Sequence, residues 1–338
     1  MHIISIINIL KGAPIALDAA FRLQGRGKIS VENRQAQQYN VYSANFGLYR
    51  KSRVSWGEFM HIRCWGSRGQ IPVSGPEYDK YGGDTTCIEL RSNDGTLIVI
   101  DAGSGIRHLG ALLLSENNLT INLLFTHLHL DHILGFPFFQ PIYHSQCSLT
   151  VYGRSFTTSG FQEALHGMMQ APYFPVDLNS LPCRICYRDI KANSFRIGSI
   201  RIKSIALNHP NGGLGFRFEA DGAVFVFLTD NELAYNLPGA LPIGAYSEFC
   251  EGADFLIHDA EFNSDEYEHF KAWGHSRYSD AVELAVKAQV RQLGLFHINN
   301  KRTDIQVDAM VQESCGILSR LGAKVTCSAI GSGFEIDL

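Results

Sequence analysis

Three histidines and an aspartate stand within six residues, directly after an apolar, strand-like segment. The hexapeptide HLHLDH occupies residues 127–132. Side chains of a strand alternate between its two faces, so His127 and His129 point to the same side. The turn that follows carries Asp131 and His132 to a neighbouring position. Imidazole nitrogens and carboxylate oxygens bind zinc and related divalent ions, so the hexapeptide predicts a metal site at this strand end. The alternative is an exposed His-rich turn that holds no metal.

The rest of the chain offers three further donors at the ends of predicted strands. His209, Asp230 and His297 are each among the first polar residues after an apolar, strand-like run. Strand ends gather at an edge of a sheet, so these side chains can meet the hexapeptide there. Taken singly, each is typical of a turn or of the surface. Taken with the hexapeptide, they predict a complete catalytic metal site.

From Met60 onward the chain alternates short β-branched or aromatic runs with segments of helical periodicity. Asp221-Gly222, between two of the runs, predicts a hairpin turn. The pattern predicts an α/β protein in which helices cover two layered sheets. The predicted strands are residues 87–91, 96–101, 121–126, 149–152, 200–206, 214–219, 223–228, 255–258, 293–296 and 324–327. The predicted helices are residues 106–115, 161–169, 276–288 and 305–321.

The hexapeptide together with His209, Asp230 and His297 resembles the HxHxDH–H–D–H ligand series of the metallo-β-lactamase superfamily, over residues 60–338. The resemblance implies an αββα sandwich of two mixed sheets flanked by helices. It also implies two divalent metal ions, for which we take zinc first and manganese as the alternative. By this resemblance the first ion would be held by His127, His129 and His209. The second would be held by Asp131, His132 and His297, and Asp230 would bridge the pair.

Hydrolysis is the reaction that such a site implies. A water between two cations has its pKa lowered towards neutrality and becomes a nucleophile at physiological pH. Asp131 is counted among the catalytic residues as well as the ligands, because its loss should lower metal binding and abolish turnover.

A second motif, Trp273-Gly274-His275-Ser276, opens the predicted helix at residues 276–288. We expect Ser276 to cap that helix, whose start would present free backbone N–H groups to an anion. The motif resembles the phosphodiesterase branch of the superfamily, which includes transfer-RNA 3′-processing endonucleases and cyclic-nucleotide phosphodiesterases. That resemblance implies that the catalytic residue His275 contacts the scissile phosphate and helps to protonate the leaving oxygen. The alternative is a histidine that belongs only to the capping turn.

The substrate is harder to predict than the reaction. The endonucleases of this branch carry Gly before the hexapeptide Asp and a long arm that grips transfer RNA. This chain has Leu130 there and no Gly- and Lys-rich segment between Tyr152 and Ile200, and its formal net charge of −4 gives no long-range attraction for nucleic acid. We therefore predict a small phosphodiester, such as a 3′,5′-cyclic nucleotide, before transfer-RNA 3′-end cleavage. A lactonase or β-lactamase comes third, and a non-catalytic binding module of the same fold represents a different class.

Other polar segments carry weaker predictions. The Gly-rich DAGSGI at residues 101–106 is typical of a strand-to-helix turn and need not bind phosphate. His258, Asp259 and Glu261 lie at a strand end, where they either support the metal ligands or form a solvated loop. Residues 168–175, rich in Met, Pro and aromatic side chains, either line a pocket beside the metals or form an edge of the core.

Residues 1–59 differ from the rest of the chain. They lack sustained periodicity, and no predicted ligand lies among them. Trp56-Gly57-Glu58 must be encoded by TGG-GGN-GAR, a purine-rich stretch suited to a ribosome-binding site before Met60. We therefore predict an N-terminal extension outside the core, a hydrolase domain over residues 60–338, and a natural start of translation at Met60.

The eight cysteines are spread through apolar segments, which predicts buried thiols in a reducing compartment. Cys183 and Cys186 form a CxxC without a second CxxC, so we predict plain packing for both. The apolar residues 2–10 are too short to span a bilayer and follow no basic residue, which predicts a cytoplasmic protein without a membrane partner. The oligomeric state stays open, and a homodimer is compatible with the sequence.

Overall fold

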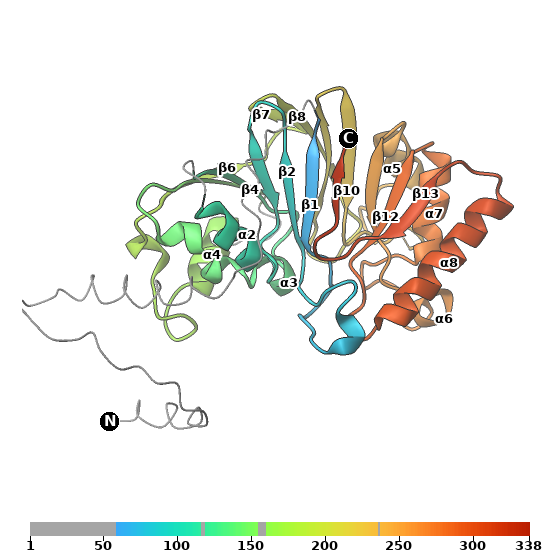
Figure 1. Ribbon diagram of the computed structural model, residues 1–338, viewed down its shortest axis with the longest axis horizontal. Helices are drawn as coiled ribbons and strands as arrows, with labels where there is room; N and C mark the ends of the chain where they lie inside the picture. Colours follow the sequence, from blue (N-terminus) through green and yellow to red (C-terminus); the bar gives the residue numbers. More distant parts are fainter. Residues whose placement is uncertain (1–58, 116–118, 155–159, 236) are drawn as a thin grey trace, which may run out of the picture. The chain divides into compact units, whose positions relative to one another are not determined.

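Two seven-stranded mixed sheets face each other, and helices cover their outer faces (Figure 1). The computed structural model describes residues 59–338 apart from 116–118, 155–159 and 236. The predicted extension and the translation start therefore stay predictions, because residues 1–58 lie outside the described part. The αββα sandwich predicted for the core is confirmed.

The first sheet contains, in spatial order, β14 (Glu335–Asp337), β1 (His61–Gly66), β2 (Cys87–Arg91), β3 (Leu97–Ile100), β4 (Thr120–Leu124), β5 (Ser148–Gly153) and β6 (Arg184–Asp189). Strands β3 to β6 run parallel, and the other neighbours in this sheet are antiparallel. Next to the pair β1 and β14, the backbone N–H of Met60 donates to the carbonyl of Leu338 at 3.2 Å, and Leu338 returns the bond at 3.0 Å. Met60, just before β1, and Leu338, just after β14, are therefore bonded to each other.

The second sheet contains, in spatial order, β13 (Thr326–Ala329), β12 (Gln292–Phe296), β11 (Phe255–Asp259), β10 (Ala223–Leu228), β9 (Leu214–Ala220), β8 (Ile200–Ala206) and β7 (Ser194–Ile197). Strands β10 to β13 run parallel, and β7 to β10 are joined antiparallel. Each sheet therefore has a parallel half, and the strands of that half end at a common edge.

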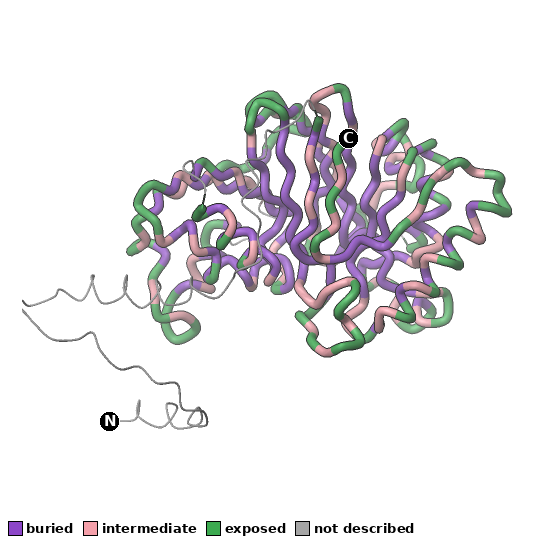
Figure 2. Tube along the Cα trace, viewed as in Figure 1, coloured by how far each residue is buried: buried purple, intermediate pink, exposed green. Residues whose placement is uncertain are grey.

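Both sheets bury both faces, because successive residues of a strand point to opposite sides. In β3, Ile98 and Ile100 enter the apolar cluster between the two sheets, whereas Leu97 and Val99 enter the cluster under the helices. Figure 2 shows the central strands buried along most of their length. A near-continuous apolar run such as LIVI is the expected sequence of a strand covered on both faces.

Helices pack against the outer face of each sheet through their buried apolar side chains. The first sheet is covered by α2 (Ile106–Leu113) and α4 (Phe161–Met168), and the second by α5 (Ile243–Cys250), α7 (Tyr278–Lys287) and α8 (Asp304–Arg320). Shorter elements are α3 (Leu130–Ile133), α6 (Ser264–Tyr267) and the 3-10 turns η3 (Pro76–Tyr78), η4 (Phe136–Phe138), η5 (Gln140–Tyr143) and η6 (Leu178–Ser180). Among the described helices, none has both the length and the apolar character needed to cross a membrane.

Every predicted strand and helix overlaps an element of the structure. The Asp221-Gly222 turn joins β9 to β10 with φ values of 55° and 79°, the two left-handed residues that a tight hairpin of this kind requires. One local prediction was wrong: α7 begins at Tyr278 with Arg277 as its N-cap, so Ser276 does not cap it. The hydroxyl of Ser276 instead donates to the Asn231 carbonyl at 2.5 Å and fixes the loop before the helix.

The cysteines follow the prediction of buried thiols only in part. Cys64, Cys87, Cys147, Cys183 and Cys250 are buried and free, but Cys186 and Cys315 are exposed. Cys186 lies on β6, whose side chains are mostly exposed because it is the last strand of its sheet. The side-chain partner of Cys183 is Cys147, so the CxxC spacing does not mark a pair.

Candidate active site

The predicted ligands meet where the parallel strands of both sheets end. In open α/β sheets the carboxyl ends of parallel strands are where sites form. The hexapeptide follows β4, Asp230 follows β10, and His297 follows β12. His209 comes from the loop after β8. All seven predicted ligands lie in two neighbouring donor groups, at the end of the sheets where Figure 1 labels α3.

The first donor group consists of His127, His129, His209 and Asp230. The Nε2 atoms of His127 and His209 each lie 3.6 Å from Asp230 Oδ2. His129 turns its Nδ1 atom inward, 2.9 Å from His209 Nε2. His129 is half-buried and the other three are buried, so the group opens to solvent on the side of His129.

The second donor group consists of Asp131, His132 and His297, with the other oxygen of Asp230 beside it. His297 Nε2 lies 3.2 Å from Asp131 Oδ2, and His132 Nε2 lies 3.2 Å from Asp230 Oδ1. Asp230 Oδ1 thus faces His132, whereas Asp230 Oδ2 lies between the two groups, 3.4 Å from His297 Nε2. All four side chains are buried.

These distances are close to the donor spacing around a pair of tetrahedral metal ions, and the 2.9 Å between His129 Nδ1 and His209 Nε2 is shorter than that spacing. Zinc binds nitrogen and oxygen at about 2.0–2.2 Å, so neighbouring donors of one tetrahedron lie about 3.3–3.6 Å apart. The Nε2 atoms of His127 and His132 are buried and have no hydrogen-bond partner. A buried polar atom without a partner is costly, and a cation at the centre of each group would satisfy it. The donors therefore fit two divalent ions.

In four of the inward-facing histidines, the outer nitrogen is held by a partner behind it, which fixes the ring orientation. Three carboxylate or carbonyl partners do this. Asp101 Oδ2 lies 2.8 Å from His132 Nδ1, the Gly274 carbonyl lies 3.0 Å from His209 Nδ1, and Glu261 Oε2 lies 3.0 Å from His297 Nδ1. The fourth is a hydroxyl: Thr126 Oγ1 lies 3.1 Å from His127 Nδ1.

Asp101 is a residue that the sequence reasoning missed. It is fully buried and also accepts from the backbone N–H and the hydroxyl of Thr126, at 2.8 and 2.7 Å. Its left-handed backbone, with φ 61°, recurs at Asp230 (φ 50°) and His297 (φ 54°). Uncommon backbone conformations of this kind cluster at functional sites. Asp101 follows an apolar strand just as the predicted ligands do, so the same signal could have found it.

His275 stands beside the second donor group without belonging to the seven predicted ligands. Its ring stacks on that of His297, with centroids 4.7 Å apart and planes 14° apart. A ring nitrogen of His275 also lies within 4.8 Å of donor atoms of Asp230 and His297. Its Nδ1 atom lies 2.7 Å from Asp259 Oδ2. His275 is buried, and its hydrogen bond to Asp259 leaves the opposite nitrogen, Nε2, without a hydrogen bond to a described residue.

The carboxylates give this cluster a strong preference for positive charge. Burial would lower the pKa of His132 and His297, but Asp230 and its neighbouring carboxylates outweigh burial and raise the pKa of both well above 6.5. Burial would raise the pKa of Asp131 and Asp230, yet the facing imidazoles hold both pKa values well below the usual range. By contrast, burial lowers the pKa of His209 to about 3.

The weaker sequence predictions divide between site and core. Asp259 and Glu261 are buried and support His275 and His297, so the solvated-loop alternative is wrong for them. His258 is buried too, but its Nδ1 atom lies 2.7 Å from the Asp259 carbonyl and it joins neither donor group. In the segment 168–175, Met169 is packed in the core whereas Tyr173 is 79% exposed.

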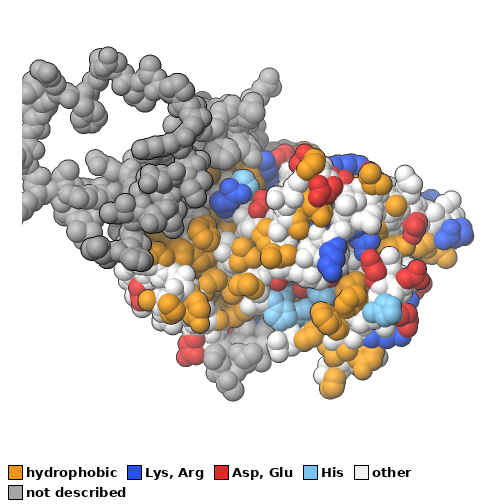
Figure 3. Space-filling view, turned by 90° about the horizontal axis from the view of Figure 1, so that it is seen from below, with side chains coloured by type: hydrophobic (Ala, Val, Ile, Leu, Met, Phe, Trp, Pro, Cys, Tyr) orange, Lys and Arg blue, Asp and Glu red, His pale blue; other side chains and the backbone are white. Residues whose placement is uncertain are grey.

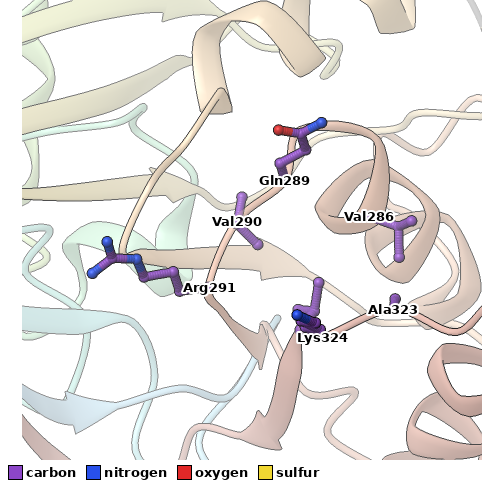
Figure 4. A pocket seen from close by; sticks show the side chains of 7 residues that line it. Val286, Gln289, Val290, Arg291, Ala323 and Lys324 are labelled. Carbon is purple, nitrogen blue, oxygen red and sulfur yellow. The ribbon is translucent and has the colours of Figure 1, made fainter.

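A separate hollow of about 360 Å³ lies at the other edge of the second sheet (Figure 4). It is lined by residues 286 and 289–291, at and after the end of α7, and by residues 323–325 before β13. These segments precede β12 and β13, whereas the donor groups follow the parallel strands. The hollow therefore takes no part in the metal site.

A comparison with protein families decides the membership of this chain. A family model described as "Beta-lactamase superfamily domain" matches residues 96–298. The chain belongs to the metallo-β-lactamase superfamily. It is a metal-dependent hydrolase of this superfamily, and its buried His and Asp clusters are typical of the superfamily's dinuclear site.

Known relatives agree with this membership of the superfamily. Ribonuclease Z of Shouchella clausii is 26% identical over 280 residues, which cover 72% of this chain and 88% of the relative. The metallo-β-lactamase-fold protein YhfI from Bacillus subtilis has a TM-score of 0.60 at 17% identity, over 83% of this chain and 100% of that one. Yeast PDE1 has a TM-score of 0.60 at 14% identity, over 83% of this chain and 99% of that one. At these identities the two structures show the shared fold.

Proposed function

We propose that this hydrolase cleaves phosphodiester bonds. The observation that carries the proposal is the buried His275–Asp259 pair, joined at 2.7 Å beside the two donor groups. The leaving oxygen of an unactivated phosphodiester is an alkoxide, which departs readily only when a proton reaches it. An oriented imidazolium in hydrogen-bond reach supplies that proton.

The surroundings of His275 favour its protonated form. Burial would lower the pKa of His275, but the carboxylates of Glu261 and Asp259 outweigh it and raise the pKa to about 9. The Asp259 carboxylate is itself fixed, because its Oδ1 atom accepts from the backbone N–H of Ser276 at 2.9 Å and of Glu261 at 3.2 Å. His275 is therefore a proton donor of fixed orientation. Its Nδ1 atom is hydrogen-bonded to Asp259, so its Nε2 atom is the one that can face a leaving group.

The two metal ions would occupy the donor groups in the order that the sequence predicts. The first donor group would hold one ion and the second donor group the other, with Asp230 between them. When bound, such ions lower the pKa of water and offset the charge of phosphate oxygens. The chain itself orients the donor rings through Asp101, Thr126, Glu261 and the Gly274 carbonyl, and it keeps bulk water from all donors but His129.

RNA is the first substrate class to test. The curated relatives that match most of this chain carry the names Ribonuclease Z and Ribonuclease BN, at 26% and 24% identity. Cleavage at the 3′ end of transfer RNA is accordingly our first candidate reaction. These relatives reverse the order of the two substrates that the sequence alone favoured.

A small phosphodiester, such as a 3′,5′-cyclic nucleotide, is the second candidate, and one observation favours it. Residues 160–183 contain no Lys or Arg. Phe161, Leu165 and Leu178 of this segment are buried in the core of the first sheet. Within the described residues, this segment therefore supplies no basic arm for the phosphates of a long RNA.

A substrate panel tests the proposal. The full chain, loaded with zinc or manganese, would be assayed on bis(p-nitrophenyl) phosphate, precursor transfer RNA, cyclic nucleotides and a chromogenic β-lactam. We expect hydrolysis of the phosphodiesters, with His275→Ala lowering turnover of RNA or cyclic nucleotide by about 10²–10⁴-fold at unchanged metal content. Hydrolysis of the β-lactam by metal-loaded protein that leaves every phosphodiester intact would contradict the proposal.

A further inference from the structure

An exposed tryptophan stands two residues before His275. Trp273 is 58% exposed, although an isolated large apolar ring at the surface has no structural need to be held still. Its backbone is nevertheless fixed on both sides. Ala272 (φ 67°) and Gly274 (φ 89°) are left-handed, and their N–H groups donate to the two oxygens of the buried Glu232 at 2.9 and 2.8 Å.

The same turn is tied to the metal centre. The carbonyl of Gly274 lies 3.0 Å from Nδ1 of His209, a predicted metal ligand. Glu232 accepts a third hydrogen bond, from the hydroxyl of Tyr267 at 2.6 Å. The fully buried carboxylate of Glu232 thus fixes, through its hydrogen bonds, the backbone of the turn that carries Trp273. The backbone position of Trp273 relative to the centre is therefore defined by the fold.

Aromatic side chains pack against the indole of Trp273. Trp273 packs edge-on against Phe270, with centroids 5.2 Å apart and planes 82° apart. Phe270 stacks on Phe262 at 5.1 Å, and Phe262 contacts the ring of His275 at 6.0 Å. A series of ring contacts thus links His275 to the exposed indole of Trp273. Edge-on packing uses the rim of a partner ring and leaves a face for another aromatic group.

The surface beside the centre is apolar rather than basic. Leu130, between two predicted ligands, is 66% exposed, and Ile71 is 55% exposed. Ile71 follows Gln70, whose N–H donates to Asp131 at 2.7 Å. Lys271, the basic residue nearest to Trp273 in the sequence, is paired with Glu268 at 2.8 Å. Figure 3 shows hydrophobic side chains around histidines on this side of the molecule.

We propose that Trp273 is the stacking platform for a nucleobase of the substrate, on the nucleotide whose phosphate is cleaved. This inference rests on the proposed phosphodiesterase function and adds a specificity-determining residue to it. A flat base with two π faces matches an exposed indole, whereas a simple alkyl phosphate does not. Aromatic stacking of this kind accepts any base and needs no basic side chain. It also explains why the turn is held rigid, since a fixed platform loses little entropy when a base binds.

Two esters with the same leaving group test the platform. Thymidine 5′-(p-nitrophenyl phosphate) carries a base, and methyl p-nitrophenyl phosphate does not. Their chemical steps match because both release p-nitrophenolate. For metal-loaded Trp273→Ala and Trp273→Leu we expect KM to rise about 5- to 150-fold on the thymidine ester, the range for one stacked base, with little change in kcat. The methyl ester should be unaffected. Trp273→Phe should stay close to wild type, because it keeps a π face. Leu321→Ala, at the 55% exposed Leu321 beyond α8, is the matched surface control.

A binding measurement separates this inference from the proposed function. Calorimetric titration of the metal-loaded chain with thymidine 5′-monophosphate and with methyl phosphate needs no turnover. If wild type hydrolysed neither these esters nor any phosphodiester of the substrate panel, the phosphodiesterase proposal would fail, and the titration would still decide about Trp273. Weaker binding of the nucleotide alone in Trp273→Ala and Trp273→Leu supports the platform. Equal changes for the base-bearing and base-free ligands, or no change for either, overturn it.

Discussion

Replacing Asp259 by Asn should remove the proton donor while leaving the metal ligands in place. In the native chain the carboxylate accepts from His275 Nδ1 at 2.7 Å and stabilises the imidazolium. An Asn that keeps its oxygen on the backbone N–H groups of Ser276 and Glu261 turns its NH₂ group towards that nitrogen. Two donors then face each other, so the ring must give up its Nδ1 proton. The neutral ring is a much weaker acid.

The magnitude follows from the protonation of His275. Its pKa is raised to about 9. At pH 7.5 such a group is almost fully protonated, whereas a histidine at its ordinary 6.5 is protonated to roughly one tenth, so protonation alone accounts for about tenfold. Misorientation adds to this, towards the roughly 10²–10⁴-fold of a positioned acid. We expect Asp259→Asn to lower kcat about 10- to 10³-fold on RNA or a cyclic nucleotide and to spare p-nitrophenyl esters.

The assay compares the two leaving groups across pH at constant metal content. Only the imidazolium donates, so the rate on an alkoxide leaving group falls as pH rises through the pKa of His275. Asp259→Asn lowers that pKa, so the fall should move to lower pH. Asp254→Asn is the control, because Asp254 lies just before the opposite end of β11, where it accepts from the Val224 N–H at 2.8 Å. An equal loss on both leaving groups, or an unshifted pH profile, would refute the reasoning.

Four further predictions concern the metal centre and the extent of the domain. Zinc binding to protein stripped by a chelator should release protons at pH 7, because His132 and His297 have raised pKa values and must be neutral to bind metal. The proton release should fade as pH rises above those pKa values. Calorimetric heats of zinc binding that do not depend on the ionisation enthalpy of the buffer would contradict this prediction. Gly274→Ala should lower the free energy of unfolding by about 1–3 kcal/mol and weaken metal binding, because the added Cβ would lie 2.1 Å from His209 Nδ1 at a φ of +89°. Gly167→Ala in α4, where the added Cβ would have no neighbour within 4 Å, should instead raise the free energy of unfolding by up to about 1 kcal/mol, measured by thermal unfolding. Asp131→Ala and His132→Ala should each lower bound metal, measured by elemental analysis, and abolish turnover, and two ions retained per chain would disprove the assignment. A chain beginning at Met60 should stay soluble and keep its metal content and activity, and insolubility would show that the preceding residues belong to the fold.

The structure brings the predicted ligands together, and these were easier to recognise in the sequence than the residues that support them. His209, Asp230 and His297 could be recognised because each follows the end of an apolar strand, and strand ends lie together at one edge of a sheet. Asp101 obeys the same rule, but the glycines after it made a structural turn the simpler interpretation. Glu232 could not be found, because its role depends on a turn 40 residues away that folds back onto it.

The fold was predicted where burial leaves a strong pattern and missed where it does not. Strands β3 and β10 are apolar runs, whereas β6 and β7 are edge strands whose exposed polar residues look like loop sequence. Ser276 has the residue type of a helix cap, yet its hydroxyl bonds the Asn231 carbonyl in a loop far away in sequence. Local preference cannot reveal such a competing long-range partner.

The mutual hydrogen bonds of Met60 and Leu338 make the core almost a closed ring. β1 runs from this junction towards Gln70, which bonds Asp131, so the junction lies at the edge remote from the donors. If a chain beginning at Met60 folds as expected, a short peptide could join residue 338 to residue 60. New chain ends could then be cut into an exposed turn such as the one at Asp221-Gly222. The order in which the strands are synthesised would thereby become an experimental variable, and it could be changed without altering the residues of the donor groups.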